Sequence, residues 1–261
     1  LDGFAFSTRA RAEPSSDRHQ ARVPCGDFFI ENAPPPEPSG NYEPFVRAYD
    51  KSGKKIYEAH GRTYELDVNI KVRQSLVVDL CGDLTGDGIP ELIMTERTMG
   101  AHCCYTHYIV SLTAPPKRLL MWEKGDSGDG MTPTRFSPSG PWQVMSHDRI
   151  MPPFDPEKGE PALVYAGIPG YPVIFDFVGG AYKRRTFAFP SALRELRAEG
   201  RAACAAQPGC EPDPIYEWGL ALMIGDWDQE KAKIVPDPEE RRPFERRAKE
   251  MTAALRLRLG P

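Results

Sequence analysis

The sequence predicts a mainly β protein with an α-helical C-terminal part and an extended, Pro-rich N-terminal arm. Strand-sized apolar runs separated by Gly and Pro turns fill residues 45–190, which is typical of antiparallel sheets. Helical periodicity begins after Pro190, and residues 1–44 are polar and rich in Pro. We therefore expect an arm at 1–44, a β-rich domain at 45–190 and a helical region at 191–261.

The arm has little apolar surface to bury. FSTRARAEPSSDRHQARVP is polar and slightly basic, and ENAPPPEPSGNYEP is dominated by Pro, so both favour extended or polyproline II backbone. An ordered arm of this kind lies either on its own domain or on a partner. We expect that it contacts a protein partner.

The β-rich domain begins with FVRAYDKSGKKIYEAHG, two strands about an Asp-Lys-Ser-Gly turn. The next segment, YELDVNIKV, alternates apolar and polar residues as one strand does. Further strands are expected at SLVVDLC, ELIMTE, YTHYIVSL, PALVYAG, YPVIFDF and AYKRRTFAF. The last two flank Val178-Gly179-Gly180, a hairpin signal.

Three helices are expected after Pro190. The first begins at Ser191 as N-cap and is interrupted at Gly200. The second has Asp213 as N-cap and Pro214 at its first position, and stops at Gly225. The third carries an apolar stripe at the spacing of one helix face: Phe244, Ala248, Met251, Leu255 and Leu259.

Composition excludes some classes of function. The net charge of −4 gives no reason to expect nucleic-acid binding, and the Arg-rich face of the last helix is interleaved with Glu, as on a solvated surface. No apolar run reaches the roughly 18 to 20 residues that span a bilayer. Six cysteines, an even number, favour an oxidising compartment, so we expect a periplasmic or extracellular protein.

The cysteines suggest covalent ties. Cys204 and Cys210 close a short loop and are expected to form a disulfide. One arrangement for the rest pairs Cys25 and Cys81 with the adjacent Cys103 and Cys104, although sequence alone leaves the connectivity open.

The stretch DLTGDGIPE, residues 83–91, places oxygen-bearing side chains at alternating positions along a tight loop. Ca²⁺ takes about six to eight oxygen ligands, and this alternation aims successive groups at one centre. The flanking segments are strand-like, which argues against a helix–loop–helix EF-hand. We predict a calcium loop whose ligands are Asp83, Thr85, Asp87, the carbonyl of Ile89, and Glu91.

This strand–loop–strand pattern, residues 79–93, resembles the calcium-binding loop of FG-GAP/VCBS-type repeats, the blade units of integrin-α-like β-propellers. The resemblance implies Ca²⁺ ligation by the five residues just named. Thr85 and Glu91 depart from the commoner Asp or Asn and Asp at their positions, and Thr85 brings no charge. The resemblance also implies propeller-like antiparallel blades, an incomplete set because 45–190 has room for about three. The chain is similar as well to a set of uncharacterised exported bacterial proteins, which implies no activity.

His102, Cys103, Cys104 and His107 form a second candidate site. Thiolate and imidazole ligands suit Zn²⁺ or copper. On a strand, however, neighbouring side chains alternate between faces, so four convergent ligands need a bulge or turn at the cysteines. In an oxidising compartment the cysteines favour a structural disulfide; a metal or redox site, a vicinal disulfide and free thiols stay open.

No catalytic signature is present: the chain lacks a Gly-rich phosphate loop, HExxH and GxSxG, and we predict no catalytic residue. The leading hypothesis is an exported, non-catalytic, calcium-stabilised interaction or accessory subunit of a larger assembly. The first alternative is a metal or redox protein that uses the His-Cys cluster. The second is a carbohydrate-binding module, suggested by aromatic residues in turn-rich segments: Trp122, Trp142 and Tyr171.

Overall fold

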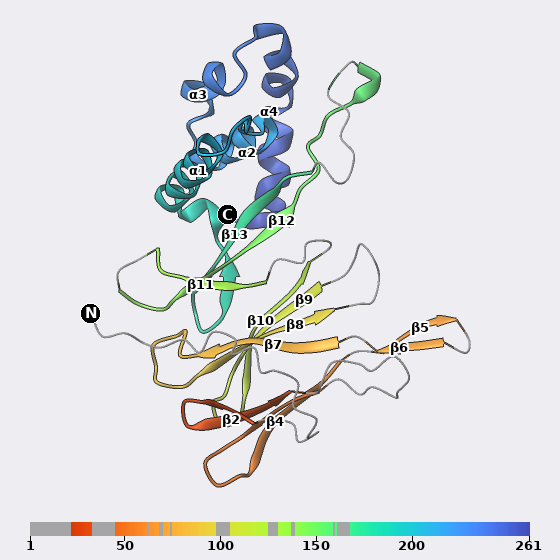
Figure 1. The fold of residues 1–261 in the computed structure, drawn as a ribbon, viewed down its shortest axis with the longest axis vertical. Coiled ribbons are helices and arrows are strands. Elements are labelled where there is room, and N and C mark those ends of the chain that lie inside the picture. The colour runs from red at the N-terminus through yellow and green to blue at the C-terminus, as the bar shows by residue number, and fades with distance from the viewer. Residues whose placement is uncertain are drawn as a thin grey trace. The chain divides into compact units, whose positions relative to one another are not determined.

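The structure is a computed structural model that describes residues 22–32, 45–61, 63–67, 70–73, 75–97, 105–124, 130–136, 139–158, 160 and 168–261. Three four-stranded antiparallel sheets are followed by four C-terminal helices, which confirms the predicted fold class at this level (Figure 1). The chain divides into two compact units. The first lies within residues 1–133, 137–142 and 177–182, and the second within 134–136, 143–176 and 183–261.

The first sheet joins four consecutive strands in the order β1-β2-β3-β4. Its strands are β1 (Val23–Cys25), β2 (Phe28–Asn32), β3 (Phe45–Tyr49) and β4 (Lys55–His60). The β3–β4 turn is the predicted Asp-Lys-Ser-Gly turn, and the Asp50 carboxylate accepts hydrogen bonds from the backbone N–H groups of Ser52 and Lys54, at 2.9 and 3.0 Å.

The predicted arm is wrong in its middle part, because β1 and β2 lie within residues 23–32. A two-residue turn at Gly26-Asp27 joins these strands, and Gly26 adopts the left-handed φ of +57° that the turn requires. Cys25 and Ile30 are buried in the core of the first unit, so this segment buries apolar surface, contrary to the prediction for the arm. The rest of the arm, residues 1–21 and 33–44, lies outside the described residues.

The second sheet has the order β10-β9-β8-β7, again a run of consecutive strands. Its strands are β7 (Ser75–Gly82), β8 (Glu91–Arg97), β9 (Tyr105–Ser111) and β10 (Lys117–Lys124). One face packs on the first sheet, and both sheets contribute to a single core cluster: Cys25, Ile30, Val46, Ala48, Leu76, Leu92, Met94, Val110 and Leu112. Where a single strand was expected at YELDVNIKV, the chain instead forms a hairpin of β5 (Thr63–Asp67) and β6 (Ile70–Arg73).

The third sheet has the order β11-β12-β13-β14. Its strands are β11 (Thr132–Thr134), β12 (Gln143–Arg149), β13 (Gly170–Phe177) and β14 (Tyr182–Arg184), with short 3₁₀ turns at η1 (Pro156–Lys158) and η3 (Thr186–Ala188). The strand expected at PALVYAG lies in residues 161–167, outside the described part of the chain.

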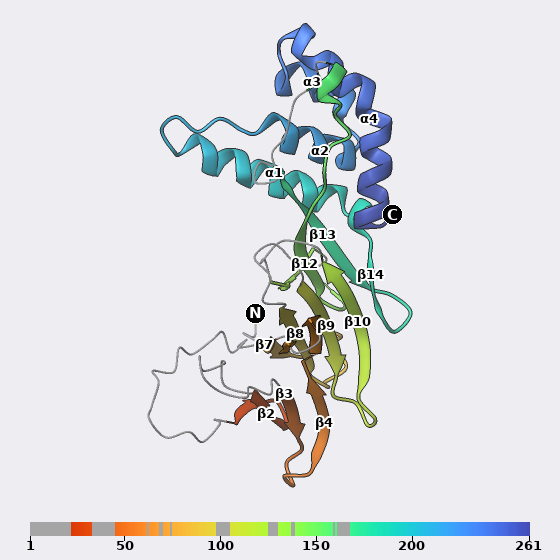
Figure 2. The ribbon, with the colours of Figure 1, turned by 90° about the vertical axis from the view of Figure 1, so that its right-hand side faces the viewer.

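The helices are α1 (Pro190–Ala205), α2 (Pro214–Ile224), α3 (Trp227–Ile234) and α4 (Pro238–Leu259). In Figure 2, α1 and α2 lie side by side, and α4 packs against α2. The ends of α2 are as predicted: the Asp213 carboxylate accepts from the Ile215 N–H at 2.9 Å, and Gly225 closes the helix at φ +85°.

The predictions for α1 are wrong in two details. The N-cap is Phe189 rather than Ser191, because Pro190 takes the first helical position, which Pro favours. The helix also continues through Gly200 to Ala205, since one Gly inside a helix costs only about 1 kcal/mol. None of the helices among the described residues has both the length and the apolar character needed to cross a membrane.

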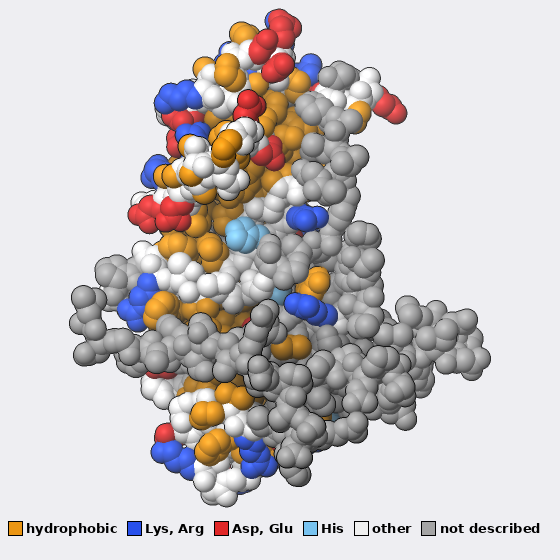
Figure 3. Space-filling model, viewed as in Figure 1, with side chains coloured by type: hydrophobic (Ala, Val, Ile, Leu, Met, Phe, Trp, Pro, Cys, Tyr) orange, Lys and Arg blue, Asp and Glu red, His pale blue; other side chains and the backbone are white. Residues whose placement is uncertain are grey.

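The core of the second unit is aromatic and charged. Trp218 is fully buried, stacks on Phe154 and meets the edges of Phe244 and Trp227. In Figure 3 hydrophobic side chains gather between the helices, with acidic and basic groups around them.

The strands before α1 belong with the helices. The Tyr171 hydroxyl of β13 donates to the Ile215 carbonyl at 2.8 Å, and Arg258 of α4 pairs with the buried Asp148 of β12 at 2.9 Å. The boundary expected after residue 190 therefore falls inside the second unit, because these contacts join segments far apart in the sequence.

Candidate functional site

The predicted calcium loop, residues 83–91, joins β7 to β8 in the first unit, and its last residue, Glu91, is the first of β8. Gly82 and Glu91 pair across the hairpin, so the loop leaves the sheet and returns to it at one point. Gly86 and Gly88 adopt left-handed φ values of +80° and +83°, which explains why glycine stands at both positions.

The two aspartates of the loop bind its own backbone. Asp83 accepts from the Gly86 N–H at 2.7 Å and from the Gly88 N–H at 3.0 Å. Asp87 accepts from the Ile89 N–H at 2.9 Å. Each carboxylate oxygen has a second lone pair, so these bonds shape the loop while leaving coordination capacity on the same groups.

Glu91 lies beneath the loop and is fully buried. Its Oε2 accepts from the N–H groups of Leu84 and Thr85, at 2.8 and 3.2 Å, whereas its Oε1 has no hydrogen-bond partner in the part of the chain that the structure describes. Burial raises the pKa of this carboxyl to about 7, against the opposing hydrogen bond from Leu84. An ionised Glu91 therefore keeps two backbone donors on Oε2, but it forms no ion pair with a basic side chain that the structure describes.

Thr85 Oγ1 is a further buried oxygen near Glu91 that has no hydrogen-bond partner among the described residues. Ser111 Oγ, which is also buried, interacts with the Glu91 carboxyl and lowers its pKa, against the larger effect of burial. Thr85 belongs to the predicted ligand set, and Ser111 stands directly opposite Glu91 in the β8–β9 register. Sequence reasoning missed Ser111, because only the register of the next strand brings it to the loop. Orphaned buried oxygens are uncommon in folded proteins, and an ion is one explanation for them.

Two distant segments of the first unit fix the loop from the other side. The Trp142 N–H donates to the Leu84 carbonyl at 2.7 Å. The Tyr182 hydroxyl lies 3.1 Å from the Trp142 carbonyl and 3.5 Å from the Leu84 carbonyl. Leu84 itself is fully buried, so the loop is anchored at its second residue.

The loop fits Ca²⁺ by the chemistry of its donors. All its candidate ligands are oxygens, as a hard cation prefers, and Thr85 Oγ1 and Glu91 Oε1 are buried and have no hydrogen-bond partner among the described residues. When bound, Ca²⁺ would supply charge that neutralises the carboxylates; Asp83, Thr85, Asp87, the Ile89 carbonyl and Glu91 would hold it. Within the described residues, no three His, Cys, Asp or Glu side chains form a metal site, so Asp83, Asp87 and Glu91 would have to move closer together to bind one ion.

Of the His-Cys cluster, the structure describes only His107, which is buried in β9; His102, Cys103 and Cys104 lie outside the described residues. The Thr95 hydroxyl donates to the Asp79 carboxylate and lies 2.9 Å from His107 Nδ1. A hydroxyl has one proton to give, so Nδ1 carries a proton and donates to Thr95. The His107 ring also stacks on Trp122, with centroids 5.5 Å apart.

The disulfides confirm one prediction and correct another. Cys204 and Cys210 are bonded, as expected. Cys25 is bonded to Cys81, so their pairing with Cys103 and Cys104 is wrong. The reason is that β1, expected in the arm, packs in the same core as β7 and brings Cys25 to Cys81.

The aromatic residues behind the carbohydrate hypothesis do not form an exposed platform. Trp122 is 7% exposed and Tyr171 is fully buried, while Trp142 is half-buried against the calcium loop. Their positions in turn-rich sequence suggested exposure, but each packs into the protein interior.

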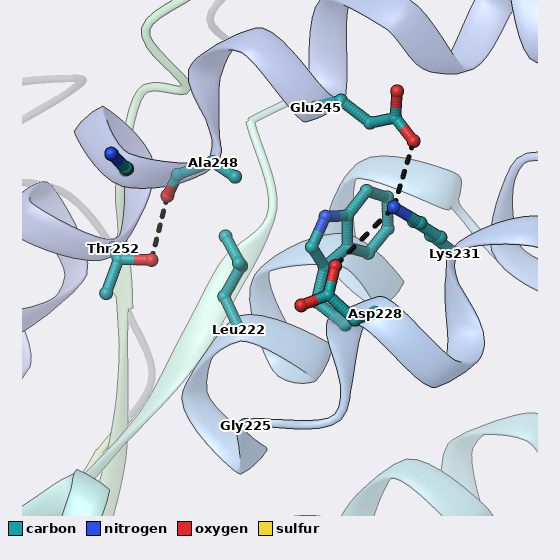
Figure 4. A pocket seen from close by; sticks show the side chains of 9 residues that line it. Leu222, Gly225, Asp228, Lys231, Glu245, Ala248 and Thr252 are labelled. Atoms are coloured by element: carbon teal, nitrogen blue, oxygen red, sulfur yellow. Dashed lines mark hydrogen bonds and ion pairs between the residues drawn. The ribbon is translucent and has the colours of Figure 1, made fainter.

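The second unit has a pocket of about 690 Å³ between α2, α3 and α4, with Leu222 and Trp227 among its walls. Figure 4 shows Lys231 reaching toward Asp228 and Glu245 at its rim, with nitrogen–oxygen distances of 3.5 and 3.2 Å. Glu245 also pairs with Arg241, at 3.6 Å, so both carboxylates at the rim are engaged by basic side chains.

Comparison with known proteins adds no relative: no family model, curated protein or solved structure matches this chain.

Proposed function

We propose that this protein is an exported, non-catalytic interaction or accessory subunit whose first unit binds Ca²⁺ through the β7–β8 loop. The observation that carries the proposal is the fully buried Glu91, with one oxygen unpaired beside the unpaired Thr85 hydroxyl. A buried carboxylate with one unpaired oxygen and no ion pair is unfavourable, and a cation held by the loop would compensate it.

We also propose that the loop belongs to the FG-GAP/VCBS type and that the sheets are propeller-like blades. Support comes from connectivity: in each four-stranded sheet the neighbouring strands are consecutive in the chain, as in a propeller blade. The Cys25–Cys81 and Cys204–Cys210 disulfides fit an oxidising compartment, which supports a periplasmic or extracellular location.

Thermal unfolding with excess Ca²⁺ and with excess EGTA tests the calcium proposal. The chelator should lower the Tm of the native protein by roughly 5–10 °C, and Asp87→Ala should abolish this response. The matched control is Asp50→Ala, which removes an aspartate that also accepts backbone hydrogen bonds in a turn but should leave the Ca²⁺ response intact. An unchanged Tm in EGTA contradicts the proposal.

The partner proposal has a separate test. Size-exclusion chromatography with light scattering on the protein purified from its native source should give a mass above that of one chain. A lone monomer would overturn the accessory role without touching the calcium site.

The second candidate, a metal or redox protein that uses His102, Cys103, Cys104 and His107, is favoured by one observation. With its proton on Nδ1, His107 would present Nε2 as the ligand atom. Stoichiometric zinc or copper in elemental analysis, lost in His107→Gln, would support this candidate; calcium alone would not.

A further inference from the structure

A second pocket, of about 580 Å³, opens in the first unit where β4 of the first sheet meets β9 and β10 of the second. Ile56, Val110 and Pro116 give it hydrocarbon walls, and the ring of Tyr108 adds an aromatic one. Its volume falls within the roughly 300–1,000 Å³ of small-molecule sites, which combine apolar walls with a few polar groups.

Arg118 brings an unbalanced positive charge to this pocket. Its one described contact is from Nη1 to the sulfur of Met121, at 3.5 Å, and among the described residues it forms no ion pair. A β-bulge between Arg118 and Leu120 interrupts the β9–β10 register here, and such bulges re-aim side chains.

The acidic residue of the pocket, Glu58, does not neutralise Arg118. Its carboxylate is engaged by Lys55 and by Arg47, whose Nε lies 2.6 Å from Oε1. These hydrogen bonds, from Lys55 first and then Arg47, lower the pKa of Glu58 to about 2, so it stays ionised and paired with them at neutral pH.

Tyr57 adds a hydrogen-bond donor. Its half-buried hydroxyl makes no hydrogen bond with any residue that the structure describes, whereas the Tyr108 hydroxyl donates to Glu96 at 2.8 Å. Burial raises the pKa of the Tyr57 phenol, against the opposing effect of the nearby Arg118 guanidinium. The phenol therefore keeps its proton at neutral pH and can donate it.

We infer that this pocket binds a small organic carboxylate with an apolar body. The guanidinium of Arg118 and the hydroxyl of Tyr57 would hold the carboxylate, and the hydrocarbon walls with the Tyr108 ring would cover the apolar part. Arg is the residue best suited to recognise a planar carboxylate, because its donors form a fixed fork. The inference does not depend on calcium at the β7–β8 loop.

Ligand-observed NMR on the full chain tests it with three probes: phenylacetate, the neutral phenylacetamide and the polar acid glucuronate. Phenylacetate should bind, and the other two should bind at least about tenfold more weakly. Arg118→Gln should weaken phenylacetate roughly tenfold or more, and Tyr57→Phe about threefold to tenfold. Lys183→Gln, the same change of charge on an exposed residue of β14, should leave binding unchanged.

Three outcomes overturn the inference: no binding of phenylacetate at about 10 mM, equal binding of the acid and the amide, or unchanged binding in Arg118→Gln. If glucuronate binds more tightly than phenylacetate, the inferred apolar body of the ligand is wrong, since a polar sugar acid would then be the ligand. Circular dichroism and the Tm of each variant show whether a loss of binding reflects the pocket or the fold.

Discussion

The β3–β4 turn and the β7–β8 loop both begin with an aspartate that accepts backbone hydrogen bonds: Asp50 from Ser52 and Lys54, Asp83 from Gly86 and Gly88. Both contain a glycine at left-handed φ. The two turns differ in the residues that lie beneath them. Residues 50–53 of the first turn are exposed or half-exposed. The loop, in contrast, covers Glu91, a buried carboxylate with one oxygen that has no partner among the described residues. An aspartate that caps a turn is thus no sign of a metal by itself; the unpaired oxygen beneath the loop is what distinguishes the two.

The largest expected difference follows from removing the acidic group of each turn. Glu91→Ala leaves the Leu84 and Thr85 N–H groups without an acceptor and opens a cavity, so we expect a loss of about 3 kcal/mol in the free energy of unfolding. Asp50→Ala leaves the N–H groups of Ser52 and Lys54 to bind water, so it should lower the free energy of unfolding clearly less. Urea denaturation of both variants in EGTA measures the difference, and equal losses would remove the distinction drawn between the turns.

The pH dependence of stability should have opposite signs at the two turns. Burial raises the pKa of Glu91 from 4.5 to about 7, so in Ca²⁺-free protein its contribution is fully present below pH 4.5 and is lost as the pH rises through 7. Relative to Glu91→Gln, we expect the free energy of unfolding to fall by about 2 kcal/mol over this window. Saturating Ca²⁺ should flatten this slope, because a cation favours the ionised form.

Asp50 provides the contrasting half of that experiment. The hydrogen bond from the Ser52 hydroxyl, followed by that from the Lys54 N–H, lowers the pKa of Asp50. Its contribution is present above the unfolded pKa and is lost as the pH falls. Urea midpoints of the native protein, Glu91→Gln and Asp50→Asn, measured across pH, separate the contributions of the two carboxyl groups. If the native protein gains stability over Glu91→Gln as the pH rises in EGTA, the raised pKa of Glu91 is contradicted.

The local part of both turns could be predicted from sequence, and the rest could not. Asp50 with Gly53, and Asp83 with Gly88, are patterns within a few residues, and the hydrogen bonds within each turn follow from them. Ser111 and Tyr182 reach the loop only through strand register and the packing of distant segments. The same limit hid β1, whose short pattern follows a polar stretch with no strand signal, and the Cys25–Cys81 bond that its packing creates.

Substitution of one glycine in each turn tests the feature that both turns share, a residue with left-handed φ. Gly53 and Gly88 have φ of +81° and +83°, and an added Cβ would meet no atom within 4 Å at either. Gly53→Ala and Gly88→Ala should each lose about 1–2 kcal/mol from backbone strain alone. Chemical denaturation in EGTA checks this. Similar losses in the free energy of unfolding would show that both turns depend on a left-handed glycine to the same extent. A much larger loss in Gly88→Ala would show that the two turns also differ in their backbone.

The smallest expected effect concerns the hydrogen bonds that distant segments make to the loop. The β3–β4 turn has instead an exposed ion pair, at 2.8 Å, between its Lys51 and Asp27 of the β1–β2 turn. Tyr182→Phe removes the hydroxyl near the Trp142 and Leu84 carbonyls and keeps the ring that packs on Phe177, so a loss of about 0.5–1 kcal/mol is expected. If this support holds the loop in shape for Ca²⁺, the variant should also bind Ca²⁺ more weakly in calorimetric titration, although Tyr182 supplies no ligand. Asp50→Ala should leave the Ca²⁺ affinity unchanged. Unaltered affinity in Tyr182→Phe would show that Asp83, Asp87 and Glu91 preorganise the loop without help from the distant segments.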